Sequence, residues 1–283
     1  MSDKRVILAV LAHPDDETFG MGGTLALYAR KGVDVHLVCA TRGEVGEVPD
    51  GMMKGFTTVA ELREDELRRA GKLLGLKSIV YLNYRDSGMP GSADNHHPQA
   101  LAAAPIEEVT GKVVHYIRLL KPQVVLTFDP IGGYRHPDHI AIQQATEKAF
   151  YAAGDSNQYK SDLPAFSPVK LYFHTMPKGT LRFGIFLMRL IGKDPHKFGR
   201  NGDIDLASIA EISFPKNAVI DFRAVAEIRE QAAACHASQG GTQITSGGLI
   251  GKIRRFLGSK DLFMRAFPPA DRHIERDLFE DIK

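Results

Sequence analysis

Two short segments of the chain concentrate histidine and aspartate side chains, and each comes after an apolar run. One segment is Ala12-His13-Pro14-Asp15-Asp16-Glu17, directly after Val6–Leu11, and the other is His136-Pro137-Asp138-His139, downstream of Val124–Phe128. Both runs have the length and composition of buried strands. An open α/β sheet builds its sites at the carboxyl ends of its strands, so these side chains are expected to meet at one edge of a sheet.

These residue types suit a divided metal site, because imidazoles and carboxylates are costly to bury without a partner. A hydrolytic zinc site takes three protein ligands and keeps one position for water. His13, Asp16 and His139 supply such a set. Asp15 is then free to act as the base on the metal-bound water, although spacing alone also allows Asp15 to replace Asp16 as the ligand. Asp138, in the first turn of a helix, is placed to orient an imidazole.

The elements that must position these groups alternate between strands and helices. This order predicts an α/β fold with a mostly parallel sheet and right-handed crossovers. We expect one domain over residues 1–283, with an α/β core carrying the metal site at 1–153 and a less regular C-terminal part at 154–283. Strands are predicted at 6–11, 33–40, 79–82, 124–128 and 169–175, and helices at 22–29, 59–74, 106–120, 138–151 and 222–238.

The C-terminal part contains an apolar stretch, 181–191, interrupted by Arg182 and Arg189. A core helix or a lid, within a segment 178–205 that closes over the cleft, is the favoured interpretation. A contact with a membrane surface or a lipid is a second interpretation, since an apolar face with basic flanks can lie on a bilayer. A homo-oligomer contact is a third. The tail at 261–269 is expected to pack back on the domain.

The overall composition excludes several other classes of protein. The net charge of +2 over 283 residues argues against a nucleic-acid partner. Cys39 and Cys235 are the two cysteines, which is too few for a disulfide framework or a thiolate zinc site. The N-terminal apolar run is too short for a signal peptide or a membrane span, so a cytoplasmic location is the default expectation.

The two segments also carry a resemblance to a known family. Ala12-His13-Pro14-Asp15-Asp16-Glu17 and Gly132-Gly133-Tyr134-Arg135-His136-Pro137-Asp138-His139 resemble the LmbE/PIG-L family of zinc-dependent N-acetylglucosaminyl deacetylases, and residues 229–239 add to the match. The resemblance implies a Rossmann-like, three-layer α/β/α fold with a C-terminal extension. It also implies Zn²⁺ as cofactor, with Fe²⁺ as an alternative. By motif, the ligands are His13, Asp16 and His139, the base is Asp15, the acid or electrophile is His136 supported by Asp138, and Tyr134 polarises the acyl oxygen.

The same resemblance indicates where the substrate would bind. Arg63 and Asp86 resemble sugar-contacting positions in the deacetylases of thiol-cofactor synthesis and their conjugate-amidase relatives. Apart from the resemblance, Arg42 and Glu44 are further candidates, because they lie in the loop after the second predicted strand, where ligands bind at a sheet edge. Arg135 would approach the mouth of the site, and His236 would line the pocket from the C-terminal part.

The leading hypothesis is therefore a zinc-dependent hydrolase that removes an N-acetyl group from a small N-acetylglucosamine conjugate. One alternative is an amidase that cleaves a larger, cysteinyl acyl group. Another is a non-catalytic sugar-binding protein, which the intact set of His13, Asp15, Asp16, His136 and His139 disfavours.

Overall fold

The computed structural model describes residues 4–176, 178–198, 202, 204–244 and 258–282. Within these ranges seven strands form one sheet, in the order β3-β2-β1-β4-β5-β7-β6. The first five strands in that order run parallel, as predicted, and β7 runs antiparallel to both of its neighbours. The strands are β1 (Val6–Leu11), β2 (Asp34–Cys39), β3 (Ser78–Tyr81), β4 (Val124–Phe128), β5 (Lys170–Thr175), β6 (Ala218–Asp221) and β7 (Lys260–Phe267).

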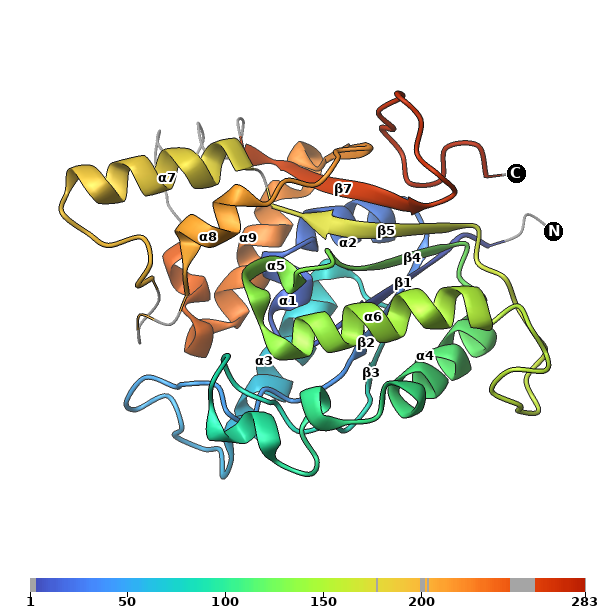
Figure 1. Cartoon of the computed structure of the whole chain (residues 1–283), viewed down its shortest axis with the longest axis horizontal. Helices are drawn as coiled ribbons and strands as arrows, with labels where there is room; N and C mark the ends of the chain where they lie inside the picture. The colour runs from blue at the N-terminus through green and yellow to red at the C-terminus, as the bar shows by residue number, and fades with distance from the viewer. Residues whose placement is uncertain (1–3, 177, 199–201, 203, 245–257, 283) are drawn as a thin grey trace.

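Helices cover both faces of the sheet, which makes the predicted three-layer α/β/α fold (Figure 1). One face carries α4 (Ile106–Leu120) and α6 (Pro137–Ala152), and the other carries α2 (Gly22–Arg30), α3 (Val59–Leu74) and α9 (Ala226–Cys235). Because helices cover both faces of β1 and β4, the sequences of these strands are apolar almost throughout and do not alternate with polar residues. Helix α3 has the predicted bounds; it begins after a capping box between Thr58 and Glu61 and is followed by Gly75 in the left-handed conformation.

The C-terminal part adds three strands to the same sheet, so it is more regular than expected. The tail predicted to pack back does so as a strand, β7, which lies between β5 and β6. The helix predicted over 222–238 is shorter: α9 spans Ala226–Cys235, with single 3₁₀ turns on either side. Glu275 is buried and accepts from Lys170 at 2.6 Å and from Arg265 at 2.7 Å, which fastens the tail to β5 and β7.

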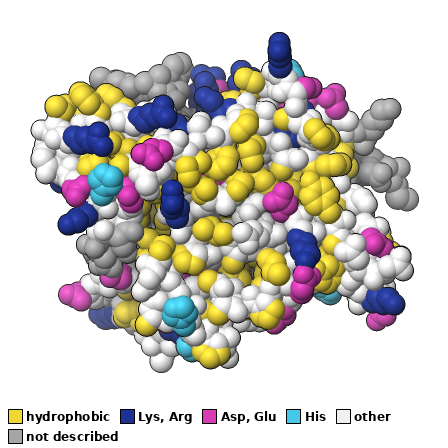
Figure 2. Space-filling view, in the orientation of Figure 1, with side chains coloured by type: hydrophobic (Ala, Val, Ile, Leu, Met, Phe, Trp, Pro, Cys, Tyr) yellow, Lys and Arg dark blue, Asp and Glu magenta, His cyan; other side chains and the backbone are white. Residues whose placement is uncertain are grey.

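The apolar stretch at 181–191 largely forms helix α7 (Lys178–Leu190), which packs on α8 (Leu206–Glu211). Its outer face exposes Phe183, Phe186 and Leu190, each more than half accessible to solvent. Figure 2 shows hydrophobic side chains beside Lys and Arg side chains at the upper left of the molecule, where Figure 1 places α7. None of the helices in the described ranges has the length and hydropathy that a bilayer crossing requires. A lid, membrane or oligomer role for this helix stays a prediction, and residues 199–201 and 203 of the predicted lid lie outside the described residues.

The strand order reverses direction between β1 and β4, since the chain adds strands on one side of β1 and then on the other. Such a switch point opens a crevice at the carboxyl ends of the two strands. The segment 12–19 leaves β1 at this point, and the segment 129–139 leaves β4 beside it. The fold therefore brings the two histidine- and aspartate-containing segments together.

Candidate active site

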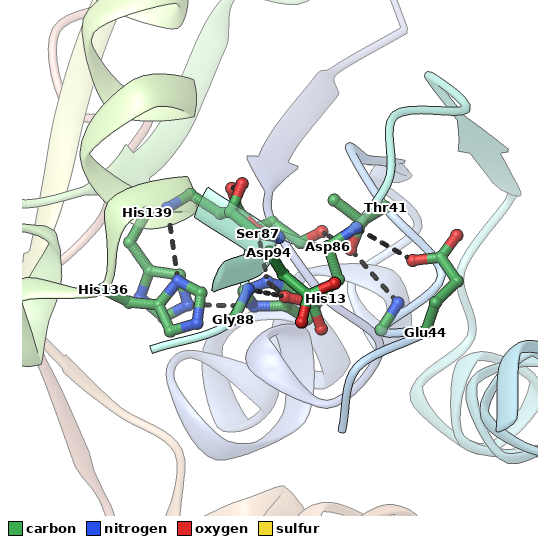
Figure 3. A network of polar contacts seen from close by, with 12 residues as sticks. His13, Thr41, Glu44, Asp86, Ser87, Gly88, Asp94, His136 and His139 are labelled. Carbon is green, nitrogen blue, oxygen red and sulfur yellow. Dashed lines mark hydrogen bonds and ion pairs between the residues drawn. The ribbon is translucent and has the colours of Figure 1, made fainter. Parts of the chain in front are cut away.

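Three side chains from the two segments converge on one point. His13 Nδ1 lies 3.2 Å from His139 Nε2, and Asp16 places its carboxylate oxygens 3.3 Å from His139 Nε2 and 3.6 Å from His13 Nδ1. His13 follows β1, Asp16 begins the short helix α1 (Asp16–Phe19), and His139 lies in the first turn of α6. Figure 3 shows the imidazoles of His13, His136 and His139 grouped together. The structure thus brings the predicted ligand set into one cluster.

The hydrogen bonds behind the two imidazoles determine which nitrogen atoms carry protons. His139 Nδ1 donates to the carbonyl oxygen of Gly132 at 3.2 Å, and His13 Nε2 donates to Asp138 Oδ2 at 3.1 Å. In the neutral tautomers, His13 Nδ1 and His139 Nε2 are then unprotonated and turn their lone pairs towards each other. Two facing lone pairs and a carboxylate repel one another unless a cation lies between them.

The donor set fits a zinc ion. Zinc–ligand bonds of about 2.0–2.1 Å in a tetrahedron place neighbouring ligand atoms about 3.3 Å apart, which agrees with the three separations in the cluster. Two imidazoles and one carboxylate are also a ligand set that iron(II) accepts. Two overlapping groups of buried side chains are spaced closely enough to hold a metal ion: one is His13, His136 and His139, and the other is His13, Asp86, His136 and Asp138.

The charges around the cluster favour a cation as well. Burial lowers the pKa of His13, but Asp86, Asp138 and Asp16 outweigh burial and hold this pKa well above its ordinary value. Burial raises the pKa of Asp16, but His139 and His13 outweigh it and hold that pKa well below its ordinary value. The same negative potential that would retain a proton on His13 stabilises a metal ion.

Asp15 lies beside the cluster in a strained conformation, with φ 121° and ψ −30°. A non-glycine residue in this region costs about 1–3 kcal/mol, and such strain is common at functional sites. The guanidinium of Arg63 donates to Asp15 Oδ2 at 3.0 Å and to the carbonyl of Pro14 at 2.7 Å. Burial raises the pKa of Asp15 to about 6, against the opposing effect of Arg63. Asp15 is therefore a carboxylate at neutral pH that can still accept a proton.

Arg63 reaches this position because the loop after β2 leaves room for it. Gly43 adopts φ +70°, and a Cβ atom there would lie 2.1 Å from Arg63 Nη1. The carbonyl of Gly43 accepts a hydrogen bond of 3.1 Å from the same guanidinium. The two terminal nitrogens of Arg63 thus donate to Asp15 and to two loop carbonyls, so Arg63 supports Asp15 and also lines the cavity.

His136 and Tyr134 lie on the other side of the cluster. His136 Nδ1 accepts the backbone N–H of Asp138 at 3.2 Å, so the proton of a neutral His136 is on Nε2. Burial, together with nearby His13 and His139, holds the pKa of His136 far below its ordinary value. His136 is therefore neutral and offers an N–H donor. Burial also raises the pKa of Tyr134, which keeps its phenol protonated as a second donor.

These groups face a cavity of about 570 Å³, a volume in the usual range for small-molecule sites. Six of the predicted residues line it: His13, Asp15, Arg63, Asp86, Tyr134 and His136. Asp86 faces His13 Nε2 at 3.5 Å and accepts the backbone N–H of Gly88 at 2.8 Å. Burial raises the pKa of Asp86, but His13 outweighs it and keeps this carboxyl ionised.

Four residues predicted to contact substrate are not among the described residues that line the cavity. Arg42 pairs with Glu64 and stacks over a tyrosine ring, and Glu44 accepts the backbone N–H of Asp86 at 3.0 Å. Arg135 points to solvent with φ 68°. His236 is fully buried. Each of the four makes other contacts, is buried or faces solvent in the structure, and a direct contact with substrate stays a prediction for them.

The structure also shows site residues that the sequence analysis missed. Ser87 donates its backbone N–H and its hydroxyl to Asp138, which orients the carboxylate that holds His13. Glu17 and His236 form a buried pair behind Asp15. Glu17 stands next to the first motif in the sequence, but its pairing with His236 could not be inferred because the two residues are 219 positions apart. The cavity wall is completed by Val45, Gly46, Glu47, Gly88, Met89, Pro90, Gly91, Ser92, Ile204 and Gln239.

Comparison with known proteins identifies the family. The family model described as "PIG-L: GlcNAc-PI de-N-acetylase" matches residues 8–150, which include both segments of the site. The chain belongs to the GlcNAc-PI de-N-acetylase family. A relative in this family, 1D-myo-inositol 2-acetamido-2-deoxy-alpha-D-glucopyranoside deacetylase from Geodermatophilus obscurus, is 36% identical over 272 residues, covering 93% of this chain and 90% of the relative.

Solved structures with the same fold are more distant in sequence. The 4-carboxy-2-hydroxymuconate hydratase of Pseudomonas putida KT2440 matches with a TM-score of 0.62 at 20% identity, covering 95% of this chain and 99% of that one. The N,N'-diacetylchitobiose deacetylase of Pyrococcus horikoshii matches with a TM-score of 0.60 at 22% identity, covering 93% and 84%. One of these is a hydratase and the other a deacetylase, so the reaction must be argued from the site and not from the fold.

Proposed function

We propose that this chain hydrolyses the acetamide of an N-acetylglucosamine conjugate, with a zinc ion held by His13, Asp16 and His139. The observation that carries the proposal is the convergence of two imidazole nitrogens and one carboxylate next to Asp15, in a member of a de-N-acetylase family. An inositol glycoside of N-acetylglucosamine is the first substrate to test, because relatives with this named activity align over nearly the whole chain.

The bound ion would supply electrophilic polarisation and a water molecule of lowered pKa. Asp15 would act as the base that takes a proton from the attacking water, a role that its pKa of about 6 allows at neutral pH. His136 Nε2–H and the phenol of Tyr134 donate hydrogen bonds to the oxygen on which negative charge develops. Because His136 is neutral, protonated Asp15 is the better group to return a proton to the leaving amine.

The remaining residues of the cavity bind and orient the sugar. Asp86 is an ionised carboxylate in the wall and can accept hydrogen bonds from sugar hydroxyl groups. The carboxyl of Asp138 holds His13 from behind and is fully buried, so we assign it to ligand orientation.

The test is acetate release by the zinc-loaded protein from N-acetylglucosaminyl-inositol and from a panel of other N-acetylglucosaminides. The same glycoside with a cysteinyl group in place of the acetyl group on the glucosamine nitrogen distinguishes a deacetylase from an amidase. Variants Asp15→Asn and His139→Ala serve as matched controls for the base and for the metal site. Zinc bound stoichiometrically without release of acetate or any other acyl group would favour the sugar-binding alternative and contradict the proposal.

A further inference from the structure

A buried pair of charged side chains joins the C-terminal part of the chain to the catalytic segment. His236, directly after α9, places Nε2 2.8 Å from Glu17 Oε1, and both side chains are completely excluded from solvent. Burying a carboxylate and an imidazole together is expensive and frequently no better than a pair of apolar residues. A structural benefit alone is therefore a poor explanation for this pair.

The second oxygen of Glu17 connects the pair to Asp15. Glu17 Oε2 accepts the backbone N–H of Asp15 at 2.9 Å. Asp15 is the residue with φ 121°, and such a backbone conformation persists only where the surrounding contacts enforce it. The orientation of the Asp15 backbone in turn determines where the Asp15 carboxylate points. A continuous series of contacts thus runs from His236 through Glu17 to Asp15.

The His236 ring itself cannot reach a substrate. It is absent from the described lining of the cavity and packs edge-on against the ring of Phe19, with 5.8 Å between centroids. Helix α9 holds the same segment at a second point, because Arg229 donates to the carbonyl oxygens of Thr18 and Phe19. The C-terminal part therefore contacts the segment 15–19 through both His236 and Arg229, on the side away from the cavity.

We propose that His236 is a positioning residue, which holds the strained Asp15 peptide through Glu17 and so fixes the direction of the base. The inference rests on the proposed function, in which Asp15 is that base. It replaces the expected substrate contact of His236 with an indirect role. It also gives the C-terminal part a function in catalysis that the match over residues 8–150 does not include.

The chain offers a matched control two residues away. Ser238 donates its backbone N–H at 2.8 Å and its hydroxyl at 2.6 Å to the buried carboxylate of Glu66 in α3. Ser238→Ala removes a side-chain hydrogen bond from the same C-terminal turn but leaves Glu17 untouched. If His236 served only to fasten this turn, the two sites would respond alike.

The experiment compares His236→Leu, His236→Gln and Ser238→Ala in the full-length, zinc-loaded protein. We expect His236→Leu to lower kcat by about 10- to 100-fold, the effect of a misdirected catalytic group, with KM and zinc content unchanged. The glutamine amide can donate to Glu17 from a similar position, so His236→Gln should recover most of the loss. Ser238→Ala should keep kcat close to that of the wild type.

Amide hydrogen exchange provides a readout that needs no activity. We expect peptides covering residues 12–19 to exchange faster in His236→Leu than in Ser238→Ala, because the Asp15 N–H loses a fixed acceptor. A wild-type kcat in His236→Leu, an equal loss in Ser238→Ala, or loss of zinc from His236→Leu would each overturn the inference. If the wild type hydrolyses no conjugate, the proposed function fails. Unchanged amide exchange of residues 12–19 in His236→Leu would overturn the positioning role, whatever the activity. If His236→Leu does not fold, His236→Gln and Glu17→Gln carry the same exchange comparison.

Discussion

Replacing Arg63 by methionine should move the acidic limb of the pH–rate profile to higher pH. Arg63 Nη2 lies 3.0 Å from Asp15 Oδ2, and the two side chains are only 5% and 16% exposed, so solvent screens the pair weakly. The guanidinium lowers the pKa of Asp15 against the effect of burial, and the balance is about 6. Removing the positive charge leaves burial unopposed and must raise this pKa.

The size of the shift follows from the distance. Charge centres about 4 Å apart at an effective dielectric constant of about 20 attract by about 4 kcal/mol, or about 3 pKa units. Measured aspartate–arginine pairs shift by about 1–3 units, so about 2 units is a reasonable expectation. The pKa of Asp15 would then rise from about 6 to about 8. At pH 7 the ionised fraction falls from about 0.9 to about 0.1, which costs about tenfold in rate and is recovered at pH 9.

The assay is kcat/KM for acetate release between pH 5 and pH 9.5, because this parameter reports the pKa values of the free enzyme. A bound metal ion lowers the pKa of Asp15 in both proteins, so the difference between the profiles is the quantity to compare. Arg63→Lys is the control, since it keeps the positive charge and should shift the limb much less. An unshifted limb in a folded Arg63→Met variant, or an equal shift in Arg63→Lys, would refute the reasoning.

Three further changes test other parts of the structure. His139→Ala removes one of three converging ligand atoms and should weaken zinc binding by more than about 100-fold. Metal analysis after dialysis against a weak chelator measures this loss, and full retention of zinc would contradict the ligand assignment. Gly43→Ala places a Cβ atom 2.1 Å from Arg63 Nη1 and should reduce activity while zinc is retained. Glu275→Ala leaves Lys170 as an unpaired buried charge and should cost about 3–5 kcal/mol in denaturant unfolding; a loss below about 1 kcal/mol would contradict this.

The α/β core could be predicted because its determinants are local. The apolar runs of β1 and β4 and the caps of α3 specify strand and helix without reference to distant residues. The encounter of His13 with His139 was predictable for a related reason. Parallel strands leave their carboxyl ends at one edge of the sheet, so two motifs that each follow a strand must come close there.

What the sequence did not predict depends on contacts between remote residues. Strand β7 carries Asp261 and Arg265 among its apolar residues, and its place in the sheet depends on pairing with β5 and β6. His236 was expected in the cavity because its motif could be recognised, but its partner Glu17 could not be inferred from spacing. Ile204 and Gln239 line the cavity from the C-terminal part, more than 60 residues after the second motif in the chain.

The position of β7 has a consequence for the order in which the protein is built on the ribosome. Residues 260–267 are synthesised after β6, yet in the finished sheet they lie between β5 and β6. Strand β6 therefore has no neighbour to pair with until β7 has emerged, whereas β1 to β5 can already associate. Both motif segments follow strands that precede β6 in the chain, whereas the sheet beside them can be completed only after residues 260–267 have been synthesised.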